Sequence, residues 1–203
     1  MQLSIFSQES ANEFARKLPN PRSRSGSWIL DQSKILQNSG IEENLNSILD
    51  KLEKDTTNEI ALVILPTIGI LTPKNLATEI FQVWGIGKLG KDNGVLILHV
   101  LDQRRIEIET GYGMEGILSD VICKRLLEER TIPYFKKGAF STGHESLLRT
   151  IDQILRNKKE AWVRFMDVRK RESGEAIAGA LWWKFEGVWK RTLEGKATGF
   201  TKE

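Results

Sequence analysis

The stretch WGIGKLGKDNGVLILHVLDQRRIEIETGYGMEGILSD, which is Trp84–Asp120, decides how this chain folds. It opens with a glycine-rich loop that leads into the apolar run of residues 94–101. Only Asp102, Gln103 and Arg104 separate this run from residues 105–110, where apolar and polar side chains alternate as in a strand with one wet face. So short a connection predicts an antiparallel hairpin. A second glycine-rich loop follows at residues 111–116.

The flanking sequence supplies further strands and helices. Residues 28–30 read as a short strand that ends at Asp31, and IALVIL at residues 60–65 reads as a buried strand. Apolar spacing predicts helices over residues 41–52, 73–84, 119–130 and 140–157. Alternating strands and helices predict an α/β fold, a three-layer α/β/α sandwich around a mixed, mostly parallel sheet, with a C-terminal helical extension.

Composition divides the chain into three parts. We expect an N-terminal lead over residues 1–18, a main domain over 19–157 and a basic, tryptophan-rich extension over 158–203. The net charge is +3, and the basic excess lies in the last part of the chain, which argues against a nucleic-acid partner for the domain. The extension reads either as a helix that docks on the domain or as an interface for a protein partner or a membrane surface. It carries Trp162, Trp182, Trp183 and Trp189.

Several features exclude other classes. The N-terminus does not resemble a signal peptide, and no apolar run reaches the roughly 18 residues that a spanning helix needs, so the chain as given reads as soluble. Cys123 is the single cysteine and falls in an apolar helical pattern, which favours a buried hydrophobe over a reactive thiol. His99 reads as a core histidine, and its distance in sequence from His144 gives no sign of a Cys/His metal site.

The second glycine-rich loop has the form of a dinucleotide-binding turn. Gly111, Gly113 and Gly116 spell G-x-G-x-x-G between a strand and a helix. However, the preceding strand belongs to a hairpin rather than to the start of a βαβ unit, and no acid that would bind a ribose ends a following strand. Nucleotide binding is therefore the less favoured interpretation.

The hairpin suggests a different site. It places the loop before its first strand beside the loop after its second strand, so Asp92, Asn93 and Glu115 should share one rim of the sheet, with Asp120 a short loop further on. Hard oxygen ligands on glycine-rich backbone suit Ca²⁺ or Mg²⁺. Spacing alone equally allows an ordinary turn at Asp92 and Asn93 and a helix N-terminal acid at Asp120.

At this point the motifs become recognisable. The lead LPNP, the segment WILD before Ile35, EIALVILPTIG, FQVWGIGKLGKDNGVLILHV, RRIEIETGYGMEGILSD and IPYFKKGAFSTGHESLL occur in this order. Over residues 19–157 the chain resembles the TPM domain family, named for a thylakoid lumen protein, a photosystem II repair protein and a nematode acetylcholine-receptor modulator. Members of this family are commonly exported or membrane-anchored.

The resemblance implies an α/β/α sandwich with an acidic pocket for a divalent cation, drawn from Asp31, Asp92, Asn93, Glu115 and Asp120. It also implies two functions. One is a non-catalytic accessory, assembly or repair module for a membrane-associated complex. The other is a metal-dependent acid phosphatase acting on phosphomonoesters, the activity attributed to plant members. The absence of a His, Cys or Ser nucleophile signature near the pocket favours the module. The sequence indicates neither the oligomeric state nor the identity of the ion.

Overall fold

The computed structural model of this protein describes residues 11–37 and 40–156. Backbone contacts divide the chain into two units, Met1–Arg156 and Asn157–Glu203, and the described residues belong to the first. The expected C-terminal helical extension and its tryptophans lie outside the described residues. In chain order, the elements are a helix over residues 11–17, α2 (Pro21–Ser25), β1 (Ile29–Asp31), α3 (Ile41–Thr56), β2 (Glu59–Leu65), α4 (Pro73–Trp84), β3 (Gly94–Val100), β4 (Arg105–Thr110), the 3-10 helix η2 (Tyr112–Met114), α5 (Asp120–Arg130), α6 (Ile132–Phe135) and α7 (Phe140–Leu155).

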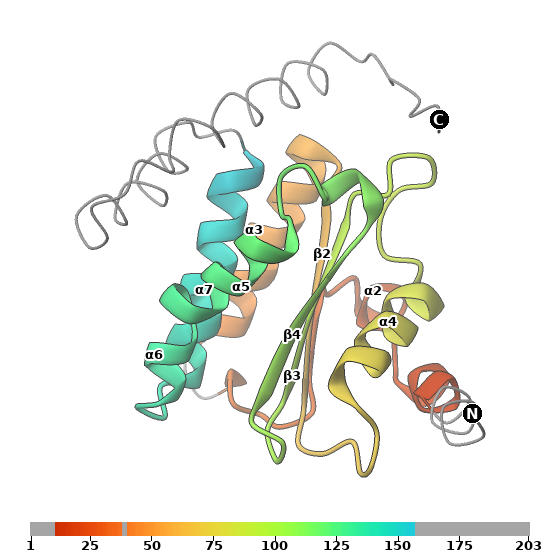
Figure 1. Ribbon diagram of the computed structural model, residues 1–203. Coiled ribbons are helices and arrows are strands. Elements are labelled where there is room, and N and C mark those ends of the chain that lie inside the picture. The colour runs from red at the N-terminus through yellow and green to blue at the C-terminus, as the bar shows by residue number, and fades with distance from the viewer. Residues whose placement is uncertain (1–10, 38–39, 157–203) are drawn as a thin grey trace. The chain divides into compact units, whose positions relative to one another are not determined.

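The four strands form one mixed sheet in the order β1-β2-β3-β4 (Figure 1). β1, β2 and β3 run parallel, and β4 pairs antiparallel with β3 as the predicted hairpin. Arg104 closes the hairpin turn with a positive φ of 51°. The predicted α/β fold with a mixed, mostly parallel sheet is confirmed.

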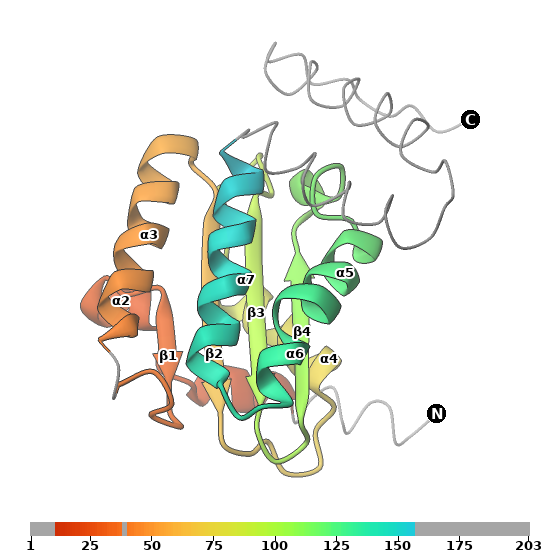
Figure 2. The same cartoon turned by 90° about the vertical axis from the view of Figure 1, so that its left-hand side faces the viewer.

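Helices cover both faces of the sheet. α3, α5, α6 and α7 lie on one face (Figure 2), whereas α4 and the helix over residues 11–17 lie on the other (Figure 1). β2 and β3 are buried along nearly their whole length because both of their faces are covered. This layering explains why their sequences read as continuous apolar runs instead of alternating.

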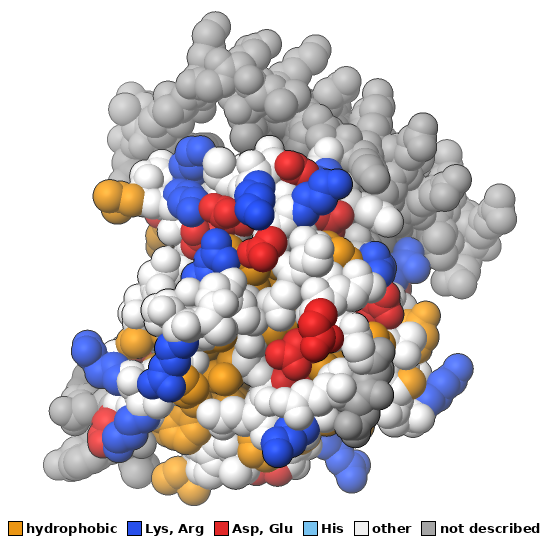
Figure 3. Space-filling view, turned by 180° about the vertical axis from the view of Figure 1, so that it is seen from behind, with side chains coloured by type: hydrophobic (Ala, Val, Ile, Leu, Met, Phe, Trp, Pro, Cys, Tyr) orange, Lys and Arg blue, Asp and Glu red, His pale blue; other side chains and the backbone are white. Residues whose placement is uncertain are grey.

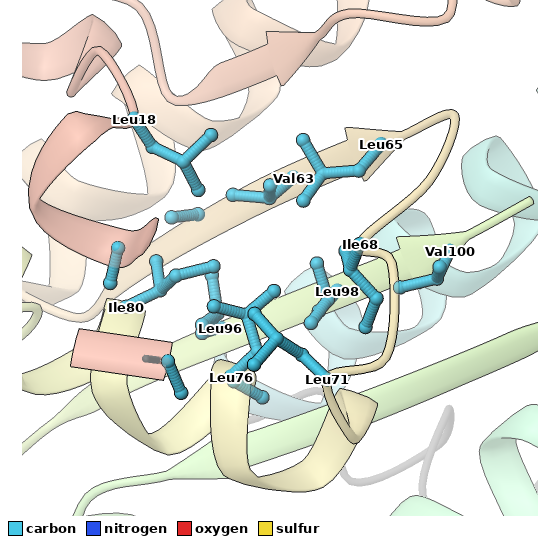
Figure 4. Close-up of a cluster of buried hydrophobic side chains, with 14 of the residues drawn as sticks. Leu18, Val63, Leu65, Ile68, Leu71, Leu76, Ile80, Leu96, Leu98 and Val100 are labelled. Carbon is cyan, nitrogen blue, oxygen red and sulfur yellow. The ribbon is translucent and has the colours of Figure 1, made fainter. Parts of the chain in front are cut away.

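The core between the sheet and α4 is closely packed and aliphatic (Figure 4). Leu76 and Ile80 of α4 meet Leu96 of β3 in this core. Burying one such side chain stabilises the fold by roughly 1.5–3 kcal/mol. Ala11, Ala15 and Leu18, from the described end of the expected N-terminal lead, are buried in the same cluster.

Two short helices were not predicted. α2 forms within the proline-rich lead because the side chain of Asn20 accepts a hydrogen bond from the Arg22 N–H and Pro21 occupies the first turn. α6 follows α5 with one intervening residue, Thr131, and begins with a proline in its first turn. Both are too short for an apolar period to show. Among the described residues, no helix is long and apolar enough to cross a membrane.

Candidate functional site

Two glycine-rich loops lie against each other at one end of the strands, before β3 and after β4. Residues 85–93 connect α4 to β3, and the residues after β4 return to the same end. The Gly111 N–H donates to the Gly94 carbonyl at 3.0 Å, and the Gly113 N–H donates to the Asp92 carbonyl, also at 3.0 Å. The predicted juxtaposition is confirmed, and we call the surface formed by residues 85–93 and 111–115 the rim.

The glycines of the rim are required by the closeness of the two loops. A Cβ atom on Gly113 would lie 2.0 Å from the Lys91 carbonyl oxygen, and one on Gly111 would lie 2.2 Å from the Asp92 carbonyl oxygen. Both distances are far inside van der Waals contact. The glycines of the G-x-G pattern therefore allow the two loops to pack closely against each other. This accounts for the pattern without a pyrophosphate-binding turn.

Asn93 ties the rim to the α3–β2 connection. Its Oδ1 accepts from the Lys88 N–H at 2.9 Å, while its Nδ2 donates to the Thr57 carbonyl at 2.9 Å and to Asn58 Oδ1 at 3.1 Å. The residue is only 6% exposed. Its amide is thus engaged within the protein and has a structural role.

Lys88 is held in place by two acids. Its Nζ lies 2.8 Å from Glu53 Oε1 and 2.8 Å from Glu59 Oε1, and Glu59 also accepts from the Gly87 N–H at 2.7 Å. The hydrogen bonds to Glu53 and Glu59 raise the pKa of Lys88. The base of the first loop is therefore fixed by side chains of α3 and β2.

Large side chains project from this fixed frame. Leu89 is fully exposed at 103%, and Tyr112 is 83% exposed. Lys91, Asp92 and Glu115 are exposed beside them, and Asp92 adopts a positive φ of 49°. The rim thus presents two apolar or aromatic groups with charges of both signs around them.

Asp31 lies at the opposite end of the strands from the rim, so the expectation that it reaches the rim is wrong. It is level with Ile64 of β2 and thereby with His99 of β3, near the end of that strand farthest from Gly94. At about 3.3 Å per residue, His99 lies roughly 17 Å from Gly94 along β3. Because β1 and β3 run parallel, their carboxyl ends lie at the same end of the sheet. The rim lies at the opposite end, where β3 begins.

The carboxylate of Asp31 has a local role. Its Oδ1 accepts from the Ser33 N–H at 3.0 Å and its Oδ2 from the Leu36 N–H at 2.8 Å, so it organises the loop after β1. It also lies in an acidic neighbourhood. Burial raises the pKa of Glu42, and the charges of Asp31 and Glu43 raise it further.

A polar groove runs along α3 near this neighbourhood, with a volume of about 630 Å³. Asn46 and Asp50 in its wall are already bonded, to the Trp28 backbone N–H at 2.8 Å and to the Trp28 indole at 2.9 Å. Figure 3 shows acidic and basic side chains intermixed over the face opposite to that in Figure 1, with one acidic patch.

Asp120 belongs to a second acidic group. As the first residue of α5 it suits the positive end of the helix dipole, and it interacts electrostatically with Lys74 of α4. Lys74 Nζ lies 2.6 Å from Glu109 Oε2 of β4 and is also acted on by Glu107. The alternation in RIEIET indicates that these glutamates share one face, but no sequence pattern predicts that Lys74 pairs with them.

The predicted cation ligands do not form one coordination shell. Asp31 lies at the far end of the strands, the amide of Asn93 is engaged, and Asp120 interacts electrostatically with Lys74. No group of three or more His, Cys, Asp or Glu side chains suited to a metal ion occurs within residues 11–37 and 40–156. Cation binding by the two remaining rim carboxylates, Asp92 and Glu115, stays a prediction.

The histidines form a buried pair that the sequence did not indicate. His99 Nδ1 lies 3.0 Å from His144 Nε2, although 45 residues separate them, and Phe135 stacks on His99 at 4.5 Å. Burial lowers the pKa of His99 to about 4; burial and the neighbouring His99 lower that of His144 well below its usual range. The expectation that His99 is a hydrogen-bonded core residue is confirmed. Cys123 is buried, as predicted.

The part of the chain that forms the sheet matches a known protein family. The TPM domain matches residues 29–154, more than half of the chain. The chain belongs to the TPM domain family. The matched range begins with β1 and ends within α7, so it contains the whole sheet and the rim. No curated protein matches the chain.

Solved structures resemble this TPM domain. The N-terminal domain of a protein from P. gingivalis, solved by NMR, is 32% identical, with a TM-score of 0.65 over 72% of this chain and 93% of that one. The N-terminal domain of the cg2496 protein from Corynebacterium glutamicum is 13% identical, with a TM-score of 0.51 over 68% of this chain and 83% of that one. The latter likeness concerns the fold alone.

Proposed function

We propose that this TPM domain is a non-catalytic binding module of a membrane-associated complex and that it docks on a protein partner through the rim. The observation that carries the proposal is the full exposure of Leu89 on a loop whose base is fixed. Tyr112 projects from the adjoining loop. A large apolar side chain held outward on a rigid frame favours binding, because little conformational entropy is lost when the partner covers it.

The charges of the rim favour a protein over a lipid surface as the partner. Asp92 and Glu115 are exposed beside Leu89 and Tyr112, and their carboxylates would be repelled by anionic headgroups. Lys91 adds a positive charge, and its Nζ lies 3.0 Å from Thr57 Oγ1. An aromatic and aliphatic centre with a mixed polar border is typical of protein interfaces.

The bonding of the reactive groups supports a binding role over a phosphatase. Lys88 and Asn93 are engaged in bonds that hold the rim together. Both histidines are buried, and Cys123 is buried with a pKa that burial raises to about 12. The rim, residues 85–93 and 111–115, contains no Ser, Cys or His. This argues against phosphoryl transfer through a covalent intermediate on such a nucleophile, and hydrolysis in the presence of divalent cations tests the metal-dependent route.

Site-directed photo-crosslinking in the cells that produce the protein tests the proposal. A benzophenone side chain replaces Leu89, and the matched control replaces Ile70, which is 101% exposed in the loop after β2 at the other edge of the sheet. We expect a discrete adduct in the membrane fraction from position 89 and none from position 70. Tyr112→Ser in the position-89 protein should weaken the adduct. Equal labelling from both positions, or none from position 89, contradicts the proposal.

A hydrolysis assay tests the alternative. The native chain, Asp92→Asn and Glu115→Gln are each incubated with a generic phosphomonoester in Ca²⁺, Mg²⁺ or Mn²⁺. We expect no turnover above that of the buffer with any cation. Hydrolysis that both substitutions abolish would place catalysis at the rim and overturn the non-catalytic role.

A further inference from the structure

β4 is an open edge of the sheet. It pairs with β3 alone, over six residues, and β3 covers only one of its two sides. In Figure 1 it lies at the front of the sheet, and no described helix crosses its outer side. Its residues from Ile106 to Thr110 are half-buried and Arg105 is exposed. An edge of this kind carries a row of backbone donors and acceptors that a further strand can use.

The ladder with β3 fixes which backbone groups point outward. Because the Gly111 N–H donates to the Gly94 carbonyl, every second residue before Gly111 bonds to β3 in the antiparallel pattern. The N–H and C=O groups of Ile106, Ile108 and Thr110 therefore point away from the sheet. Within residues 11–37 and 40–156, no backbone–backbone hydrogen bond joins these groups to another element.

The two faces of β4 have opposite chemistry. Ile106 and Ile108 lie on the face of the histidine pair, level with His99 and Ile97 of β3. Glu107 and Glu109 lie on the α4 face, level with Leu98 and Leu96. A strand added alongside would place its own alternating side chains next to an apolar row on one face and an acidic row on the other.

The acidic row, with Asp120 near it, is only partly neutralised. Lys74 is the cation at its centre, and Glu109, Glu107 and Asp120 all act on it, with Glu109 Oε2 at 2.6 Å. Arg105 approaches Glu107 only to 3.9 Å and is itself exposed. Three carboxylates, Glu107, Glu109 and Asp120, thus stand beside two cations, Lys74 and the exposed Arg105. The remaining negative charge is one that a basic side chain on a neighbouring strand would complement.

A second copy of this chain fits the edge poorly. Antiparallel pairing of β4 with its own copy through the outward groups sets residues of the same face opposite each other. With Ile108 facing Ile108, Glu107 lies opposite Glu109, and with Ile108 facing Ile106, Glu107 lies opposite Glu107. Like charges directly opposite each other destabilise a strand pair. The acidic row thus disfavours self-association and favours a partner of the opposite charge.

We infer that β4 binds an extended peptide segment in which apolar and basic residues alternate, and that this segment becomes a fifth strand. Backbone hydrogen bonds to Ile106, Ile108 and Thr110 supply the pairing, and the two faces of β4 read the alternation. Strand addition of this type gives affinity through the main chain and selectivity through the side chains. This surface is separate from the rim, so the inference does not depend on the proposed function.

Binding of a short peptide that alternates valine and lysine tests the inference. Fluorescence anisotropy measures the affinity for the full chain, and a peptide with glutamate in place of lysine is the matched control. We expect the lysine peptide to bind at least tenfold more tightly than the control and to weaken as salt is raised. NMR should show slower hydrogen exchange at the amides of Ile106, Ile108 and Thr110 when the lysine peptide is bound.

Variants of β4 separate strand addition from simple charge attraction. Ile108→Pro removes an outward N–H without breaking the ladder to β3, and we expect at least a tenfold loss of affinity, whereas Ile108→Val should bind as the native chain does. Glu107→Gln should reduce both the affinity and its salt dependence. Leu89→Ser at the rim should leave peptide binding unchanged.

Three results would overturn the inference. The first is equal affinity for the lysine and glutamate peptides. The second is native affinity in a folded Ile108→Pro variant. The third, which needs no variant, is protection from exchange centred on α3 with no change in β4, which would show that the peptide binds at the α3 groove.

Discussion

Acidification should destabilise this domain through the buried pair of His99 and His144. The two rings are joined at 3.0 Å between His99 Nδ1 and His144 Nε2, and Phe135 stacks on one of them. A neutral pair satisfies this bond, because one ring donates its proton and the other accepts it. Protonating both rings removes the acceptor and buries two like charges. We therefore expect stability to fall as the pair is forced to bind protons.

The pKa values set the sign and the pH range. An unfolded histidine titrates near pH 6.5, whereas burial lowers the pKa of folded His99 to about 4. Between these values the unfolded chain binds more protons than the folded one, so stability present above pH 6.5 is lost progressively down to about pH 4. At pH 5.0 the loss from His99 is about 2 kcal/mol. The pKa of His144 is also lowered, by burial and by the neighbouring His99, so this residue adds to the loss. About 2 kcal/mol from His99 alone is already a substantial part of a typical 5–15 kcal/mol.

The assay compares the pH dependence of the native chain with that of the double variant His99→Leu, His144→Leu. Urea unfolding, followed by circular dichroism, gives the free energy of unfolding at several values between pH 7.5 and 5.0. Leucine has nearly the volume of histidine, and removing both partners leaves no unpaired nitrogen, so stability at pH 7.5 should change little. The double variant should lose at least about 2 kcal/mol less than the native chain on acidification.

The comparison has an internal control and a clear contrary result. Carboxylates elsewhere titrate equally in both proteins, so only the difference between the two curves reports the histidines. A double variant that loses as much stability as the native chain would refute the reasoning. So would an NMR titration in which the ring of folded His99 binds a proton near pH 6.5.

Three further substitutions test the site. Gly113→Ala should destabilise the domain by roughly 1–3 kcal/mol in urea unfolding, because the new Cβ meets the Lys91 carbonyl oxygen at 2.0 Å, and an unchanged free energy of unfolding would contradict the close approach. Asn93→Ala removes the acceptor for the Lys88 N–H and should cost about 1–3 kcal/mol; an unchanged midpoint would deny its structural role. Asp31→Ala should cost a similar amount yet leave any Ca²⁺ affinity measured by calorimetry unaltered, and a lost affinity would place Asp31 in a cation site after all.

The hairpin was the most predictable part of the fold, because the connection from Leu101 to Arg105 is too short for anything else. It also predicted the contact between Gly113 and Asp92, since an antiparallel pair must return to its starting edge. Asp31 was misplaced because its position depends on the parallel order of β1 and β3, which local sequence does not encode. His99 and His144 meet only because α7 packs over β3, a long-range contact without a local pattern.

The two loops of the rim touch through main-chain atoms at their glycines, with no side chain between them. Their spacing is therefore independent of what projects outward at Leu89 and Tyr112, provided the glycines and Asn93 are kept. The domain thus provides a rigid backbone frame on which the outward side chains can be exchanged. Substitutions at positions 89 and 112 alone should redirect binding to a new target without any loss of folding, which makes this edge a practical starting point for engineering a binder.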